Sequence, residues 1–220
     1  MERVKRAFMG WAGRVTSHAL TLFVQMLTAV RADWRGCEPV PHQRVYYANH
    51  VSNGDMPMIW ASLPPGLRRN VRPVAAADYW LKTPMRRFIG YDVFNTVLVD
   101  RRKEERDEDP MAKILKALEE GSSLIIFPEG NRNMTDDPLL PFRAGLYNIG
   151  KAFPEVDLIP TWVGNVNEVM PKGEVIPLPL MCTVTYGAPV RVKEGEEIGD
   201  FLDRASEALI AVSPHAKAAA

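Results

Sequence analysis

The sequence predicts a single α/β domain, with a mostly buried sheet flanked by helices and preceded by an N-terminal amphipathic helix or helix pair. Short apolar runs typical of buried strands alternate with segments whose apolar residues recur at helical spacing. A chain of 220 residues is long enough for one substantial core. We therefore expect an N-terminal helical segment over residues 1–35 and one globular domain over residues 36–220.

The N-terminal segment has basic residues in its first six positions and is largely apolar over residues 19–30. A helix needs about 20 apolar residues to cross a bilayer, and extending this run backwards meets His18 and Arg14, which are costly at membrane depth. A signal peptide fits poorly, because the apolar run starts late and no small-residue cleavage site follows. Two interpretations stay open: a helix in the membrane interface, or a helix packed on its own domain.

The first half of the domain alternates between strand-like and helix-like runs. Residues 45–48 combine Val, Tyr and Ala in a short buried pattern, and the next helical run stops at Pro64-Pro65-Gly66. Pro84 interrupts or redirects a later helix. We expect strands over residues 45–48, 73–77 and 93–99, and helices over residues 56–63 and 78–88.

The second half follows a run of nine charged residues at 101–109, which is typical of a solvated loop. Asp109 as N-cap and Pro110 at the first helical position then begin a helix that Gly121 ends. We expect helices over residues 111–120, 146–153 and 201–212, and strands over residues 123–127, 158–163 and 182–186.

Composition excludes little beyond the unusual classes. The apolar fraction of 46% and charged fraction of 25% are ordinary for a globular protein, and the net charge of zero gives no electrostatic sign of a nucleic-acid partner. The two cysteines, Cys37 and Cys182, have no metal-site spacing and indicate reduced thiols in a cytosolic protein. No metal site is predicted.

Two short motifs carry residues suited to chemistry. In Asn49-His50-Val51-Ser52-Asn53-Gly54-Asp55, a histidine can act as a base near neutral pH while a carboxylate orients its ring. His50 and Asp55 are five residues apart, so they would lie on different faces of a regular helix. They can meet only if the backbone turns at residues 52–54. Phe127-Pro128-Glu129-Gly130-Asn131-Arg132 adds an acid and a cation after an apolar run.

Four blocks in order resemble the glycerolipid acyltransferase family, which includes 1-acylglycerol-3-phosphate acyltransferases. They are the two motifs above, the run Val97-Leu98-Val99-Asp100-Arg101 and the run Leu158-Ile159-Pro160-Thr161-Trp162-Val163. Taken alone, the first motif also fits a loop histidine beside a helix-capping aspartate, and the second fits a strand that ends in a turn.

The resemblance implies an acyltransferase domain that moves a fatty acyl group from a thioester to the hydroxyl of a lysophospholipid, most simply 1-acylglycerol 3-phosphate. The thioester, of coenzyme A or acyl carrier protein, would be a co-substrate, so no cofactor is implied. The enzyme would work at the cytoplasmic face of the membrane as a peripheral or monotopic protein. The implied site consists of His50 and Asp55 as the catalytic pair, with Arg101, Glu129, Gly130 and Arg132 binding the acceptor.

Each acceptor-binding residue has an expected task. Arginine suits a phosphate because it offers a planar fork of donors. Glu129 would hold glycerol hydroxyls or orient Arg132, and Gly130 would let the backbone approach the substrate. Arg101 equally fits a surface salt bridge with the neighbouring acids. The segment Phe142-Arg143-Ala144-Gly145 resembles the family's basic, glycine-containing segment, and equally fits the start of a helix.

Several departures from the family pattern leave the acceptor's head group open. The glycine that usually opens the block ending in Asp100-Arg101 is replaced near Asn95. Asn131 and Asn133 stand where Thr and Ser are usual. The usual lysine is missing around residues 76–78. The acceptor could therefore be glycerol 3-phosphate or another lysolipid. A thioester hydrolase and a non-catalytic lipid-binding protein are the alternatives from other classes, although no Gly-x-Ser-x-Gly elbow is present.

Overall fold

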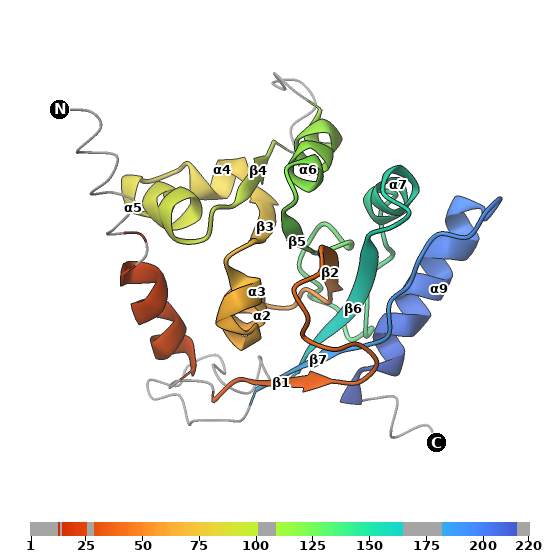
Figure 1. The fold of residues 1–220 in the computed structure, drawn as a ribbon, viewed down its shortest axis with the longest axis horizontal. Helices are drawn as coiled ribbons and strands as arrows, with labels where there is room; N and C mark the ends of the chain where they lie inside the picture. Colours follow the sequence, from red (N-terminus) through yellow and green to blue (C-terminus); the bar gives the residue numbers. More distant parts are fainter. Residues whose placement is uncertain (1–12, 14, 26–28, 101–108, 165–181, 215–220) are drawn as a thin grey trace.

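A sheet of seven strands lies between two layers of helices (Figure 1). The structure is a computed structural model that describes residues 13, 15–25, 29–100, 109–164 and 182–214. One α/β domain with a mostly parallel sheet flanked by helices confirms the predicted fold class, and an N-terminal helix precedes the sheet.

The central strands are parallel, as expected for strands joined through helices. The sheet order is β1-β7-β6-β2-β5-β3-β4, with β7 antiparallel to β6 and β1 parallel to β7. The strands are β1 (Arg31–Trp34), β2 (Arg44–Ala48), β3 (Val71–Ala76), β4 (Val97–Val99), β5 (Ser123–Ile126), β6 (Asp157–Gly164) and β7 (Thr183–Tyr186).

The helices fall close to the predicted runs, and their ends follow the predicted signals. The Asp109 side chain accepts a hydrogen bond from Met111 N at 3.1 Å, Pro110 opens the helix, and Gly121 adopts a φ of 81° after it. The helices are residues 15–25, α2 (Asp55–Ser62), α3 (Pro65–Arg68), α4 (Ala77–Trp80), α5 (Pro84–Phe88), the π-helical turn η1 (Ile89–Val93), α6 (Pro110–Glu119), α7 (Gly145–Ala152) and α9 (Ile198–Ala211).

Alternate strand residues build two cores, one on each face of the sheet. In β2, Tyr46 and Ala48 enter the core shared with α2, whereas Val45 and Tyr47 enter the core shared with α6, α7 and α9. Figure 1 shows the second group of helices on the right-hand side of the sheet. Because helices cover both faces of the sheet, its strands are held firmly in place. A site built on the ends of these strands is therefore held firmly as well.

Two regions differ from the prediction. The sheet begins with β1 at Arg31, inside the range assigned to the N-terminal segment, because its polar-looking residues pair with β7 rather than forming an apolar run. The strand expected over residues 93–99 covers only Val97–Val99. Helix α5 continues into η1, and Asn95 then takes a φ of 50°, which breaks an extended run and which Asn tolerates better than most residues. Arg101 and most of the charged run lie outside the described residues.

The N-terminal helix packs on its own domain along one face. Leu20 and Val24 contact the core that contains α2. Gln25 Nε2 donates to the Ala61 carbonyl at 3.0 Å, and the Thr21 hydroxyl accepts from Arg68 Nη1 at 3.1 Å. These contacts orient the helix against the end of α2.

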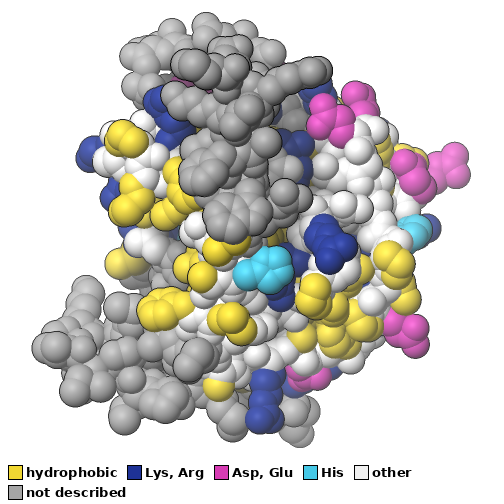
Figure 2. All heavy atoms as spheres, turned by 60° about the vertical axis from the view of Figure 1, so that its left-hand side comes forward, with side chains coloured by type: hydrophobic (Ala, Val, Ile, Leu, Met, Phe, Trp, Pro, Cys, Tyr) yellow, Lys and Arg dark blue, Asp and Glu magenta, His cyan; other side chains and the backbone are white. Residues whose placement is uncertain are grey.

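The opposite face of this helix carries apolar side chains exposed to solvent. Val15, Leu22 and Phe23 are 49%, 60% and 60% exposed, and their spacing places them along one stripe. Figure 2, which brings the left-hand side of Figure 1 forward, shows exposed hydrophobic side chains beside Lys and Arg on this face of the molecule. Among the described residues, no helix has the length and apolar character needed to cross a membrane.

Candidate active site

The two motifs meet at the carboxyl ends of neighbouring strands. β2 pairs with β5, and His50 follows the end of β2 while Glu129 follows the end of β5. Ligands of parallel α/β sheets bind at this edge of the sheet, where loops replace the helices that cover its faces. One strand pairing thus brings together His50 and Glu129, which are 79 positions apart in sequence.

His50 and Asp55 form a hydrogen-bonded pair. The distance from His50 Nδ1 to Asp55 Oδ2 is 2.8 Å. The backbone turns between them as residues 52–54 predict, with Ser52 Oγ accepting from Gly54 N at 3.0 Å. Asp55 is the first residue of α2 and is fully buried, so its negative charge lies at the positive end of the helix dipole.

One oxygen of Asp55 accepts three hydrogen bonds. In addition to the histidine ring, Oδ2 accepts from Val51 N at 2.8 Å and from Ser52 N at 2.9 Å. Because this oxygen can only accept, the neutral His50 ring must carry its proton on Nδ1. Nε2 is then the atom able to take a proton, and the His50 side chain is 19% exposed.

The second motif supports the histidine ring and its peptide. The Phe127 ring stacks on the His50 ring, with centroids 4.2 Å apart and an interplanar angle of 21°. His50 N donates to Glu129 Oε1 at 2.8 Å, and the His50 carbonyl accepts from Asn133 N at 2.6 Å. The backbone N–H and the carbonyl of His50 are therefore both held by the turn that follows β5.

Glu129 joins two loops. Its second oxygen, Oε2, accepts from Leu140 N at 2.8 Å, and the residue is 3% exposed. Burial raises the pKa of this carboxyl, while the hydrogen bonds from Leu140 and His50 act against that rise. Both carboxylate oxygens are engaged with backbone groups, so the structure gives Glu129 a role in positioning His50. The expected contact with acceptor hydroxyls stays a prediction.

Asn49 and Asn133 are positioning residues that sequence reasoning did not single out. The Asn49 amide exchanges two hydrogen bonds with the Val163 backbone, at 2.8 and 3.1 Å, and so ties the end of β2 to β6. The Asn133 side chain accepts from Thr135 N at 2.9 Å and donates to the Asp137 carbonyl at 2.7 Å, which shapes the loop after the second motif. The sequence feature that indicates such a role is an amide side chain at a strand end or turn, where it can hydrogen-bond to backbone groups.

Gly130 makes room for a neighbouring arginine. Its φ is 73°, a conformation that favours glycine, and a Cβ built there would lie 2.5 Å from Arg143 Nε. Arg143 is held at the same place through its backbone, whose N donates to the Pro128 carbonyl at 2.9 Å. The structure thus supplies a reason for glycine at this position in addition to the expected approach of substrate.

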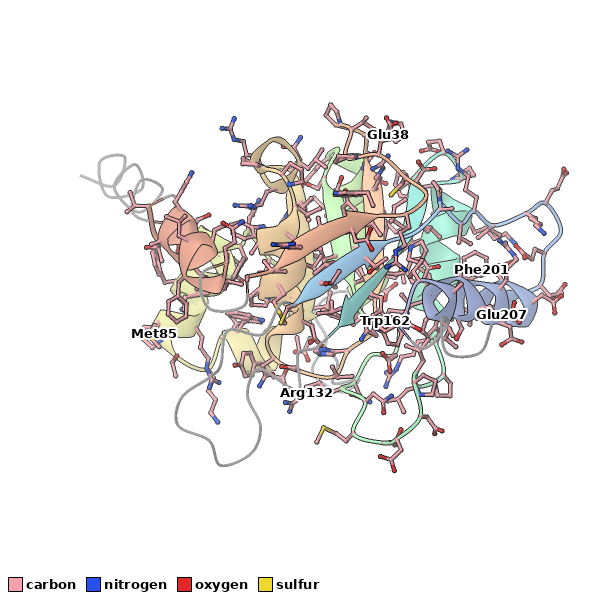
Figure 3. All side chains as sticks on the ribbon, turned by 90° about the horizontal axis from the view of Figure 1, so that it is seen from below. Glu38, Met85, Arg132, Trp162, Phe201 and Glu207 are labelled. Carbon is pink, nitrogen blue, oxygen red and sulfur yellow. The ribbon has the colours of Figure 1, made fainter. Side chains whose placement is uncertain are left out.

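The structure brings together four of the six predicted site residues: His50, Asp55, Glu129 and Gly130. Arg132 follows on the same turn, is exposed, and projects at the edge of the molecule (Figure 3). Arg101 lies outside the described residues. Within the described ranges, no group of three or more His, Cys, Asp or Glu residues is arranged to hold a metal ion.

Comparisons with known proteins identify one family from the sequence and a similar fold from the structure. The sequence model of the acyltransferase family matches residues 31–164. A solved structure, the 1-acyl-sn-glycerophosphate acyltransferase PlsC from Thermotoga maritima, has a similar fold, with a TM-score of 0.66. That similarity covers 91% of this chain and 80% of the other at 21% sequence identity. No curated protein sequence matches this chain.

Proposed function

This chain belongs to the acyltransferase family, and we propose that it transfers an acyl group from a thioester to the hydroxyl of a lysophospholipid. The proposed acceptor is 1-acylglycerol 3-phosphate, which would give phosphatidic acid. The observation that carries the proposal is the oriented His50–Asp55 pair, whose Nε2 is the ring atom left for the acceptor. The acceptor class is supported by the fold shared with the Thermotoga maritima protein, a 1-acyl-sn-glycerophosphate acyltransferase.

The proposed reaction needs one base and no covalent enzyme intermediate. His50 Nε2 takes the proton of the acceptor hydroxyl as its oxygen attacks the thioester carbonyl carbon. The tetrahedral intermediate then breaks its carbon–sulfur bond, and the leaving thiolate takes the proton from the imidazolium. The products are an ester and a free thiol, so protons and electrons balance.

Asp55 assists this cycle in two ways. Its Oδ2 keeps the ring proton on Nδ1, which leaves Nε2 basic, and its charge stabilises the imidazolium that forms during attack. The backbone N–H groups of Val51 and Ser52 hold the carboxylate in place and restrict its rotation. General-base catalysis of this kind contributes about 10²–10⁴-fold to the rate.

Thiol release from a long-chain acyl thioester tests the function. Acyl-coenzyme A and acyl-carrier-protein thioesters are each offered with lysophosphatidate, with glycerol 3-phosphate, or with no acceptor. We expect release that depends on lysophosphatidate and that is lost in His50→Ala, with the melting temperature of that variant near the wild-type value. Release without an acceptor would indicate a hydrolase instead, and binding of lipid with no release would indicate a binding protein.

We also propose that the N-terminal helix holds the enzyme at the membrane surface without crossing it. Support comes from Leu22 and Phe23, whose side chains are exposed on the face turned away from the domain. Exposed apolar side chains beside basic ones suit the boundary between acyl chains and anionic head groups. Such a position is useful because both substrates carry long acyl chains, whereas the reacting groups must reach a polar site.

A further inference from the structure

A second arginine, Arg143, lies against the turn that holds His50. The positions of its Nε, Cδ and Cζ atoms fall 2.5 to 2.8 Å from where a Gly130 Cβ would be, so the guanidinium rests directly on the Gly130 backbone. Its own backbone N donates to Pro128 O, which belongs to the same turn. Phe127 and Glu129 of this turn contact the His50 ring and peptide. Arg143 is therefore packed on the structural support of the proposed base.

The side chain of Asn131 holds the guanidinium in this position. With its amide oriented so that both of its polar groups are satisfied, Asn131 accepts from Arg143 Nη2 at 3.1 Å and donates to the Gly130 carbonyl at 3.0 Å. A guanidinium whose orientation is set before a ligand arrives loses less conformational entropy on binding than a free surface arginine does.

The charge of Arg143 has no anionic partner among the described residues. Arg143 is exposed, and none of the ion pairs in the described part of the chain includes it. By contrast, the exposed Arg191 donates from both Nε and Nη2 to one carboxylate oxygen of Asp157. An oriented cation that pairs with no carboxylate in the described part of the chain, beside a proposed active site, is suited to an anionic part of the substrate.

We propose that Arg143 binds the phosphate of the acceptor, with Gly130 and Asn131 holding its guanidinium for that purpose. This role rests on the proposed function for the identity of the acceptor. A phosphomonoester carries close to two negative charges at neutral pH and several acceptor oxygens, so it suits a guanidinium that is already held in one orientation. Gly130 is then needed because any larger residue would displace the guanidinium.

Steady-state kinetics with two acceptors test the role. Lysophosphatidate carries the phosphate, and 1-acylglycerol presents the same hydroxyl without it. We expect Arg143→Gln to raise KM for lysophosphatidate by about tenfold to a hundredfold, the range for losing one hydrogen bond to a charged group. The kcat with lysophosphatidate and the slower transfer to 1-acylglycerol should change less than about threefold, because the His50–Asp55 pair is untouched. Arg143→Lys should fall between wild type and Arg143→Gln.

Two further variants sharpen the result. Arg69→Gln, an exposed arginine after α3 at the opposite end of the sheet, should leave KM unchanged. Asn131→Ala should raise KM by less than Arg143→Gln does, and should add nothing in the double variant, because it acts only through the arginine. An unchanged KM in Arg143→Gln, or equal losses with both acceptors, would overturn the proposal.

Binding measured without a thioester separates this proposal from the proposed function. Calorimetric titration of glycerol 3-phosphate into wild type and Arg143→Gln reports the phosphate contact independently of turnover. Weaker binding to Arg143→Gln supports the phosphate role even if no transfer is seen, in which case only the proposed function fails. Equal binding to both proteins overturns the role of Arg143 even if wild type is an active transferase.

Discussion

Replacing Asp55 by Asn is expected to weaken catalysis strongly without abolishing it. The reason lies in the three donors that converge on Asp55 Oδ2, from the His50 ring and from the backbone of Val51 and Ser52. An amide nitrogen placed there would face these donors, so the Asn carbonyl oxygen must take the position. It would still accept the Nδ1 proton, and the His50 ring would keep the tautomer that leaves Nε2 basic.

The expected magnitude follows from losing charge while keeping the hydrogen bond. A hydrogen bond to a charged group contributes about 1.5–3 kcal/mol, against about 0.5–1.5 kcal/mol for a neutral pair. The attraction between a carboxylate and an imidazolium about 4 Å apart adds up to ~4 kcal/mol near a protein surface. A loss of about 2–4 kcal/mol in the transition state corresponds to roughly 30-fold to 1,000-fold in kcat. Loss of the correct tautomer in the serine-protease triad costs about 10⁴-fold.

The assay is lysophosphatidate-dependent thiol release by Asp55→Asn, Asp55→Ala and His50→Ala, with thermal melting of each. Asp55→Ala should be the worst folded, because it leaves two backbone N–H groups without their acceptor. His50→Ala sets the activity that remains without a base. A folded Asp55→Asn protein that is as inactive as His50→Ala would refute the reasoning, since the retained tautomer should preserve measurable turnover.

Three other variants test Glu129, Arg132 and the N-terminal helix. Glu129→Gln should lower kcat and melting temperature, because one of two part-buried backbone N–H groups would face an amide nitrogen. Burial raises the folded-state pKa of Glu129, so the stability that this carboxyl contributes is fully present at low pH. That stability is lost as pH rises through the folded-state pKa. Urea unfolding at several pH values should show this loss in wild type and not in the Gln variant. Arg132→Lys should raise KM for lysophosphatidate severalfold in the same assay, because a bidentate fork becomes a point charge, and an unchanged KM would remove phosphate binding from this residue. Leu22→Glu with Phe23→Glu should reduce co-sedimentation with anionic liposomes, whereas Ile198→Glu, 40% exposed on α9, should not.

Strand and helix positions were predictable where a local physical signal was strong. The helix α6 was bounded correctly because Asp109, Pro110 and Gly121 each favour one backbone conformation at that place. The strand β1 was missed because Arg31–Trp34 has no apolar periodicity, and only pairing with β7 makes it a strand. Elements specified by nearby residues can therefore be predicted from the sequence, whereas elements specified by partners far along the chain cannot.

The same limit applies to the candidate site. The proximity of His50 and Asp55 was predictable, because the turn that joins them lies between them in sequence. The clamp that Glu129 and Asn133 place on the His50 peptide was not predictable, since it depends on β2 and β5 being neighbours. Nor could the sequence indicate that Arg143 fills the space beside Gly130.

Strand order also ranks the predicted cations by their distance from the base. Neighbouring strands lie about 4.8 Å apart, so the end of β5 is one spacing from the end of β2. β4, which belongs to the run Val97-Leu98-Val99-Asp100-Arg101, is two spacings from β5 and three from β2, or about 10 and 14 Å. The turn that carries Gly130 and Arg132 therefore starts nearest to His50. An acceptor whose hydroxyl meets His50 reaches the cations of this turn first, and only a ligand that extends across the end of β3 could approach the end of β4.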